Sequence, residues 1–262
     1  MSTPTLVSHP AAAPPLQRRE IEDFTRFEFK YILATERAQS LETEIRNFMD
    51  YDGHVSENYD ENYYVRSLYF DNERRSNYYE KIDGIRSRRK YRLRTYAPEP
   101  SAEVPIYLEE KNRIDNRVFK HRVKLDSELV ALCEGGGMAF QLRSLYPDNE
   151  VIERFIFRQA RQRERPAVVV AYLRRAFVSS FDINFRVTFD SELHAAGATE
   201  LFGVRIGEMR QCLAGYTIVE IKFARRIPSW FHRILQTFEM RRLSVSKYCK
   251  AMETAGRAVD LS

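Results

Sequence analysis

Arginine and lysine occupy every second position of one short stretch in the first half of the chain. The stretch comprises Arg86, Arg88, Lys90, Arg92 and Arg94. Side chains at i, i+2 and i+4 share one face of a β-strand, so this spacing predicts a strand face made of positive charge. The planar fork of arginine grips two phosphate oxygens at once and keeps its proton. The stretch therefore predicts contact with a phosphate-rich anion.

Three glutamates each stand two residues before a lysine, in the pattern E-x-K. The pairs are Glu28 with Lys30, Glu109 with Lys111, and Glu220 with Lys222. Carboxylate oxygens suit Mg²⁺ or Mn²⁺, and Mg²⁺ takes one or two carboxylates in proteins while keeping several waters. The three glutamates are therefore candidate metal ligands. The alternative interpretation is that each pair is an ordinary ion pair on a strand.

Further cations and one tyrosine follow the same alternating pattern elsewhere in the chain. They are Lys120, Arg122, Tyr172, Arg174 and Arg186. Transfer of the terminal phosphoryl group of a triphosphate depends mainly on positioning and on neutralisation of charge. Cations that project from several strands can supply both, if the strands bring them together.

Eight short segments alternate with the period of a strand, and amphipathic patterns between them predict helices. The expected strands are Phe24–Leu33, Tyr63–Asp71, Arg86–Tyr96, Ile106–Asn112, Arg117–Leu125, Ala167–Arg175, Ile183–Asp190 and Tyr216–Phe223. The expected helices are one capped by Thr35, one over 126–145 broken at Gly135–Gly137, one over 149–163, one that starts near Pro228, and one capped by Ser244 or Ser246.

Two arrangements fit these strands. The charged faces can lie in water, as in an ordinary half-exposed antiparallel sheet. Alternatively, the strands close into a barrel with the charges inside and the apolar faces outside, under helices. The several amphipathic helices and the arginine-rich charged faces favour the second arrangement, an α+β fold, but the pattern alone leaves both arrangements open.

The composition excludes several other classes of protein. The 262 residues carry a net charge of +5, and the cysteines number three, at positions 133, 212 and 249. An odd number of cysteines with no zinc spacing argues against a disulfide scaffold, so a reducing cytoplasm is the expected location. No apolar run approaches the length of a membrane-spanning helix. There is no P-loop motif, and residues 1–19 are expected to form a disordered tail.

The order of the segments resembles the catalytic domain of the vacuolar transporter chaperone (VTC) family. These polyphosphate polymerases belong to the triphosphate tunnel metalloenzymes, a CYTH-like superfamily. The motifs are RFEFKYIL, RSLYFDN, RRKYRLRTY, YLEEKNR, VFKHRV, VVAYLRRAF, FRVTFDSEL, TIVEIKF and SVSKYCKAM, in that order. The resemblance covers roughly residues 24–255 and implies an eight-stranded antiparallel tunnel over 20–262, with helices packed outside.

The resemblance also implies roles for individual residues. The implied phosphate-binding residues are Lys30, Arg92, Arg94, Lys111, Lys120, Arg122, Tyr172, Arg174, Arg186, Lys222, Ser246 and Lys247. Among them, Arg92, Arg94, Lys111 and Lys247 are the implied catalytic residues. Glu220 matches a metal-binding glutamate, with Glu28 and Glu109 as further candidates. The opening motif reads R-x-E-x-K instead of E-x-E-x-K, and Lys124 is a rival for the role of Lys120.

These roles imply a metal-dependent polyphosphate polymerase that uses Mn²⁺ or Mg²⁺. Such an enzyme passes the terminal phosphoryl group of ATP to a growing polyphosphate chain. Two alternatives stay open: a triphosphatase or polyphosphatase of the same superfamily, and a non-catalytic polyphosphate-binding module. The expected ligands are ATP or triphosphate and polyphosphate, with no specific nucleic acid. An unidentified membrane or protein partner stays open.

Overall fold

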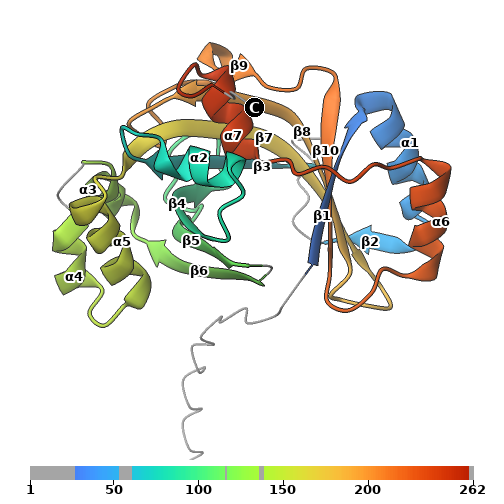
Figure 1. The fold of residues 1–262 in the computed structure, drawn as a ribbon, viewed down its shortest axis with the longest axis horizontal. Coiled ribbons are helices and arrows are strands. Elements are labelled where there is room, and N and C mark those ends of the chain that lie inside the picture. Colours follow the sequence, from blue (N-terminus) through green and yellow to red (C-terminus); the bar gives the residue numbers. More distant parts are fainter. Residues whose placement is uncertain (1–26, 53–60, 116, 136–138, 260–262) are drawn as a thin grey trace, which may run out of the picture.

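A curled antiparallel sheet forms the centre of the molecule, which is described by a computed structural model over residues 27–52, 61–115, 117–135 and 139–259. The main strands follow the path β1 (Phe27–Ala34), β10 (Tyr216–Phe223), β8 (Arg186–Gly197), β7 (Arg165–Ser179), β3 (Tyr63–Asp71), β4 (Ser87–Thr95), β5 (Ile106–Ile114) and β6 (Arg117–Leu125). Two short strands add to it, with β2 (Met49–Tyr51) on β7 and β9 (Arg210–Gln211) on β8. All eight predicted strands are present, and the α+β fold class is confirmed (Figure 1).

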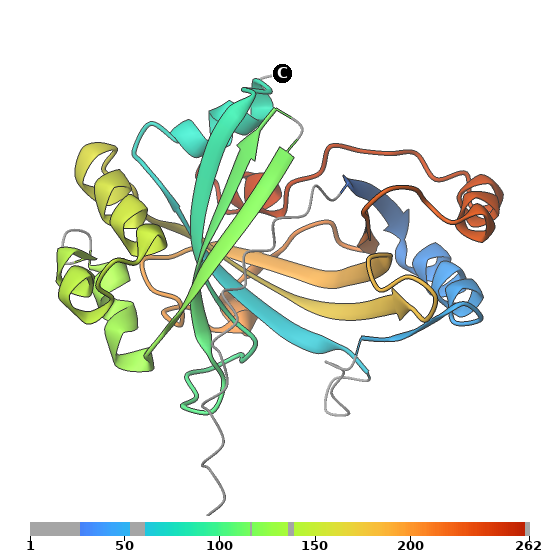
Figure 2. The same ribbon diagram turned by 90° about the horizontal axis from the view of Figure 1, so that it is seen from below.

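The helices lie around this sheet. They are α1 (Thr35–Ile45), α2 (Ser76–Ile82), α3 (Val130–Glu134), α4 (Leu142–Leu145), α5 (Glu150–Arg161), α6 (Ser229–Thr237) and α7 (Lys247–Thr254), with short 3₁₀ turns at Ser127–Leu129, Ala139–Gln141 and Ile206–Glu208. Figure 2 shows β4, β5 and β6 crossing over the other long strands, with α3–α5 at one end and α1 and α6 at the other. The predicted tail over 1–19 lies outside the described residues, as do two of the three glycines at 135–137.

Backbone hydrogen bonds do not close the sheet in the described part of the chain. β1 and β6 end the path of strands, and neither pairs with the other. An ion pair bridges the gap instead, because the Lys111 ammonium on β5 lies 3.5 Å from a carboxylate oxygen of Glu28 on β1. The predicted eight-stranded tunnel is therefore an open, curled sheet, and a side-chain ion pair spans the gap between its two ends.

The apolar strand faces point away from the interior and lie beneath helices. On one side Leu93 and Leu108 pack with Phe155 of α5. On the other side Ile221 packs with Leu41 of α1, in a cluster that also contains α6. This arrangement puts the charged faces inside. Phe27 is an exception to the expected burial, because it is 47% exposed at the start of β1, where it stacks on Phe223.

Helix α7 packs on the inner face of the sheet, in a buried cluster that also contains Tyr78 of α2 (Figure 1). Its residues Tyr248 and Met252 join a buried cluster with Val170 and Leu193 of the sheet. The Ser246 hydroxyl accepts a hydrogen bond from the backbone N–H of Cys249 at 3.3 Å, which confirms Ser246 as the helix cap. The helix therefore begins inside the sheet and presents Lys247 to its charged interior.

Two sequence expectations about helices were wrong. Thr35 is the first residue of α1 and not its cap, since the capping position is held by Ala34, which has no side-chain hydroxyl. Helix α2 was not predicted, because its seven residues show no apolar period. Its start depends on the carboxylate of Asp71 at the end of β3, which accepts hydrogen bonds from the backbone N–H groups of Asn77 and Tyr78, at 3.0 and 3.3 Å.

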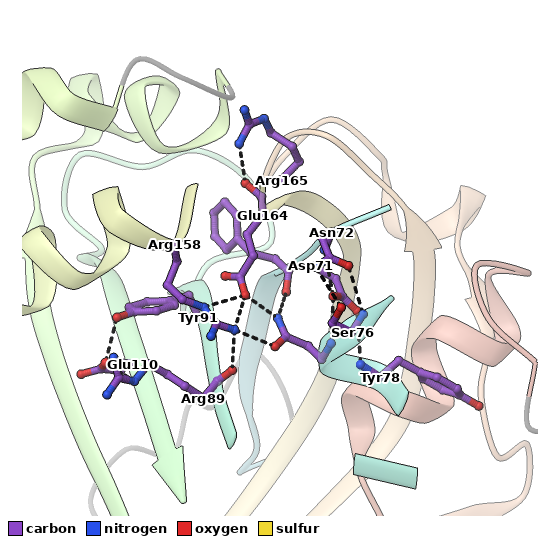
Figure 3. A network of polar contacts seen from close by, with 12 residues as sticks. Asp71, Asn72, Ser76, Tyr78, Arg89, Tyr91, Glu110, Arg158, Glu164 and Arg165 are labelled. Carbon is purple, nitrogen blue, oxygen red and sulfur yellow. Dashed lines mark hydrogen bonds and ion pairs between the residues drawn. The ribbon is translucent and has the colours of Figure 1, made fainter. Parts of the chain in front are cut away.

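A buried polar network joins α2, α5 and the sheet (Figure 3). Arg158 of α5 donates to Glu164 and, at 3.0 Å, to the side chain of Asn77. Asn77 in turn donates to Glu164 at 2.9 Å. The Tyr248 hydroxyl donates to Asp71, which links α7 to the same region. Hydrogen-bonded buried polar groups specify one arrangement of the elements, and here the Tyr248–Asp71 contact fixes α7 relative to the strands.

Candidate active site in the tunnel

Glu109 is the centre of the first of three ionic clusters inside the tunnel. Its carboxylate is buried, and it accepts from Arg92 at 2.6–2.7 Å and contacts Lys120 at 3.0 Å. Arg94 lies 3.8 Å away, and its guanidinium also donates to Ser67 at 3.3 Å. Strands β4, β5 and β6 position these groups, because every second residue faces inward. One acid thus holds three cations.

Electrostatics at this cluster favours the charged form of the acid. Burial raises the pKa of Glu109, but Arg92, Arg94 and Lys120 outweigh burial and hold that pKa below its usual range. For the base, burial and the two nearby arginines lower the pKa of Lys120 to about 8, in spite of Glu109. Lys120 therefore carries a proton that it can lose at mildly alkaline pH.

Asp190 organises a second cluster, and the sequence analysis did not single it out. Its buried carboxylate accepts two hydrogen bonds from Arg174, at 2.6 and 2.8 Å, and contacts the Lys247 ammonium. Burial opposes ionisation, but Arg174 and Lys247 lower the pKa of Asp190. The Tyr172 hydroxyl accepts from both Arg174 and Arg94 at 3.3 Å, so it connects the first two clusters.

Lys30 lies between two glutamates in the third cluster. Its ammonium is 2.8 Å from Glu28 and 3.5 Å from Glu220. Glu220 also contacts Lys222 at 2.9 Å and Lys247 at 3.9 Å, which joins this cluster to the second. Burial and Glu220 raise the pKa of Glu28, but the surrounding lysines more than offset this and leave it below its usual range. Both glutamates are therefore ionised near neutral pH.

The third cluster is also the part of the tunnel best suited to a divalent cation. Glu28 and Glu220 come from neighbouring strands and reach the same ammonium, so one cation can meet both carboxylates. Two carboxylates with several waters match the ligands that Mg²⁺ prefers. Glu109 is less suited, because three cations already surround its oxygens. Within the described ranges, no three His, Cys, Asp or Glu side chains form a metal-binding group.

Other residues that the sequence singled out lie around these clusters. The Arg122 guanidinium stacks on the ring of Tyr107, 4.8 Å from its centre, and Arg186 pairs with Asp52 and donates to Tyr63 at 3.3 Å. Lys124, the rival of Lys120, is exposed. Lys120 instead contacts the buried carboxylate of Glu109 at 3.0 Å, which favours Lys120 as the inner lysine.

Cations outnumber carboxylates on this inner surface. Lys30, Arg92, Arg94, Lys111, Lys120, Arg174, Lys222 and Lys247 face Glu28, Glu109, Asp190 and Glu220. In the described part of the chain, the buried Oγ1 of Thr188 and Nε of Arg186 have no hydrogen-bond partner. Buried charge needs a compensating partner, so the surface suits an anion with many oxygens.

A curled antiparallel sheet around buried arginines, lysines and carboxylates defines a triphosphate tunnel fold. The VTC domain family matches residues 25–255, and the chain belongs to this family. No helix in the described ranges is both long enough and apolar enough to cross a membrane.

Solved structures with similar folds include three of low sequence identity. A candidate adenylate cyclase, bh2851 from Bacillus halodurans, has a TM-score of 0.49 at 12% identity and covers 84% of this chain and 92% of its own. HpAC1 from Hippeastrum, for which a dominant triphosphatase activity is described, has a TM-score of 0.49 at 13% identity. The match covers 88% of this chain and 96% of HpAC1. The Mimivirus capping enzyme triphosphatase has a TM-score of 0.35 at 9% identity and covers 82% and 88%. Among curated proteins no match was found.

Proposed function

We propose that this protein is a metal-dependent polyphosphate polymerase. It transfers the terminal phosphoryl group of ATP to the end of a polyphosphate chain in the tunnel and releases ADP. The observation that carries the proposal is the convergence of buried cations from β1, β4, β6, β7 and α7 around only four carboxylates. Membership of the VTC domain family supports phosphate as the acceptor.

Arginine and lysine supply most of the catalysis in this proposal. Arg92 and Arg94 lie two residues apart on β4, so their guanidinium groups grip oxygens of the transferred phosphoryl group and its neighbour. Glu109 holds Arg92 through Nε and Nη2, which fixes that arginine before substrate arrives. Groups that are already oriented towards developing charge need no reorganisation during the reaction.

Lys247 faces the reacting phosphates from the opposite side. It extends from the first turn of α7, where free backbone N–H groups add to its positive charge. In the free protein its ammonium is held by Asp190. An incoming phosphate oxygen competes for this ammonium, so Asp190 keeps Lys247 in place without neutralising it fully. Lys111 and Lys120 complete the wall provided by β5 and β6.

A divalent cation would be held by Glu220 and Glu28. When bound, it would neutralise part of the phosphate charge and orient the triphosphate. Lys30 must then move away from one or both carboxylates, and its ammonium becomes available to a phosphate oxygen. These carboxylates also distinguish the proposal from a purely binding role, because holding a polyanion requires no acidic ligands.

A triphosphatase with the same site is the second candidate function. The two activities differ only in the acceptor, which is a phosphate oxygen for the polymerase and water for the hydrolase. Incubation with labelled ATP and Mn²⁺, followed by separation of ADP, free phosphate and long-chain polyphosphate, distinguishes them. ADP with polymer supports the polymerase, free phosphate without polymer supports the hydrolase, and tight polyphosphate binding without turnover supports the binding module.

A further inference from the structure

The inner row of β4 continues beyond the active site into a second basic region. Arg92 and Arg94 are held by Glu109, but Lys90 and Arg88 have no carboxylate within 4 Å among the described residues. Lys90 rests instead on the ring of Tyr248, with its nitrogen 4.2 Å from the ring centre. The row is therefore ion-paired to a buried carboxylate at one end, whereas at the other end only more distant carboxylates, Asp71 and Glu80, act on Lys90 and Arg88.

A cavity of about 560 Å³ lies at the Arg88 end of the row. Its lining residues are Gly84, Ile85, Arg86, Arg88, Arg113 and Asp115. Arg88 and Arg113 are direct partners across β4 and β5. Like charges opposite each other on neighbouring strands repel, so an arrangement of this kind is unfavourable without an anion between them.

Existing hydrogen bonds leave most of these donors available. Arg88 donates one bond to the backbone oxygen of Ile85 at 2.7 Å, and Arg113 donates one to the backbone oxygen of Asp115 at 2.7 Å. Each guanidinium has five N–H donors, so most of them can face a ligand. Burial and Arg113 lower the pKa of Arg88 from its ordinary value, which is the effect expected of crowded positive charge.

The cavity continues the wall of the tunnel. Arg88 lies two residues from Lys90, and Arg113 lies two residues from Lys111, so both face the same side of the sheet as the site residues. The Lys81 ammonium of α2 donates to the Ser244 hydroxyl at 2.8 Å, and burial together with Arg88, Lys30 and Arg113 lowers the pKa of Lys81 in spite of Cys249. Phosphates that leave the active site past Lys90 therefore meet further cations in succession.

The chemistry of the lining selects a phosphate chain over a nucleoside. Within the described residues, no aromatic ring lines the cavity, so it offers no surface on which a base can stack. Guanidinium groups bind phosphate oxygens in pairs. From Arg92 to Arg86 the strand spans about 20 Å at roughly 3.3 Å per residue, which is too far for a triphosphate to contact both ends.

We infer that Arg86, Arg88 and Arg113 form an outer subsite that binds the distal part of a polyphosphate chain while its end lies in the active site. This inference rests on the proposed function for the identity of the chain. It gives the tunnel a direction, because polymer then leaves past the cavity lined by these arginines. The subsite adds affinity for long chains and keeps them attached between successive transfers.

The double variant Arg86→Gln/Arg88→Gln tests the subsite by binding, without any need for turnover. Dissociation constants are measured by calorimetry for inorganic triphosphate and for a polyphosphate several tens of phosphates long. We expect affinity for the long chain to fall about a hundredfold, because two charge-assisted contacts are lost, and affinity for triphosphate to stay within about twofold. Equal losses for both ligands, or no loss for the long chain, would overturn the inference.

A matched control removes the same charge elsewhere. Arg143→Gln/Arg161→Gln replaces two exposed arginines on the α4 and α5 side, and we expect it to leave both affinities unchanged. If this control weakens the long chain equally, net charge alone explains the effect and the subsite is rejected. Melting temperatures of both variants verify that they are folded.

The outcomes separate the subsite from the proposed function. If the wild type makes no polymer from ATP but loses its long-chain preference in Arg86→Gln/Arg88→Gln, the subsite stands and the polymerase proposal fails. If the wild type makes polymer and the variant binds and extends long chains as before, the polymerase stands and the subsite fails. When both are correct, the variant still makes polymer from ATP, but its chains are shorter than those of the wild type.

Discussion

We expect Asp190→Asn to destabilise the free protein and to increase the stabilisation gained from inorganic triphosphate. Asp190 is buried, accepts two hydrogen bonds from Arg174 and contacts Lys247. Asparagine keeps the size of the side chain but removes its charge, so two cations that are each only 10% exposed lose their compensating anion. Removal of one partner from a buried ion pair costs about 3–5 kcal/mol.

The expected size of the effect follows from this cost. At the lower end of that range, about 3 kcal/mol, and with about 2–4 °C per kcal/mol for a domain of this size, the melting temperature falls by roughly 6–12 °C. Triphosphate oxygens can replace the lost carboxylate next to Arg174 and Lys247. The ligand should therefore raise the melting temperature of the variant by more than it raises that of the wild type.

Thermal unfolding with and without a fixed concentration of triphosphate measures both effects. Asp83→Asn is the matched control, because Asp83 is exposed at the end of α2, and this change should alter neither quantity. An unchanged melting temperature for Asp190→Asn would refute the reasoning about buried charge. A lower melting temperature with no extra gain from triphosphate would show that the anion does not bind at Arg174 and Lys247.

Three further predictions concern activity and binding. Arg94→Ala should lower kcat/KM about ten- to a hundredfold, since a charge-assisted contact is worth about 1.5–3 kcal/mol, and initial rates that match the wild type would contradict its role. Glu220→Gln should lower activity by an amount that shrinks as the Mn²⁺ concentration is raised, whereas the loss in Arg94→Ala should not shrink. Full activity of Glu220→Gln at limiting metal would move the metal site to Glu28 or Glu109. Because the pKa of Lys120 is about 8, its charge is present below that pH and lost above it, so affinity for triphosphate should fall between pH 7 and 9. Lys120→Arg should flatten this dependence in calorimetric titrations, and an equally steep fall would assign it to another group.

The alternation of charged and apolar residues was enough to predict the strands, but it left two arrangements open, with the charges in water or inside a barrel. The resemblance to the VTC catalytic domain selected the inward direction of the charges. The period of two assigns each side chain to one face of its strand. Helices with apolar stripes then need the apolar strand faces to pack on. This reasoning placed Arg92 and Lys120 on one inner surface, and the structure brings them to the same carboxylate. It could not predict the open seam, which depends on how far the sheet curls.

Asp190 was missed because its importance comes from contacts distant in sequence. In the chain it is a single acid near the end of an expected strand, without the E-x-K pattern that marked the glutamates. Its partners Arg174 and Lys247 lie 16 and 57 positions away. Helix α2 was missed because its seven residues show no apolar period. Asp71 satisfies its first N–H groups, and packing against α7 and the sheet replaces an apolar stripe.

The pairing of β1 with β10 has a consequence for how the chain folds. In the described residues, β1 pairs with β10 and with no other strand, and β10 lies about 190 positions further along the chain. Closing so long a loop is entropically costly and slow, and until it closes β1 presents an unpaired edge. During synthesis the first strand must therefore wait for nearly the whole chain to emerge. Loss of β10 would leave β1 without the strand that it pairs with.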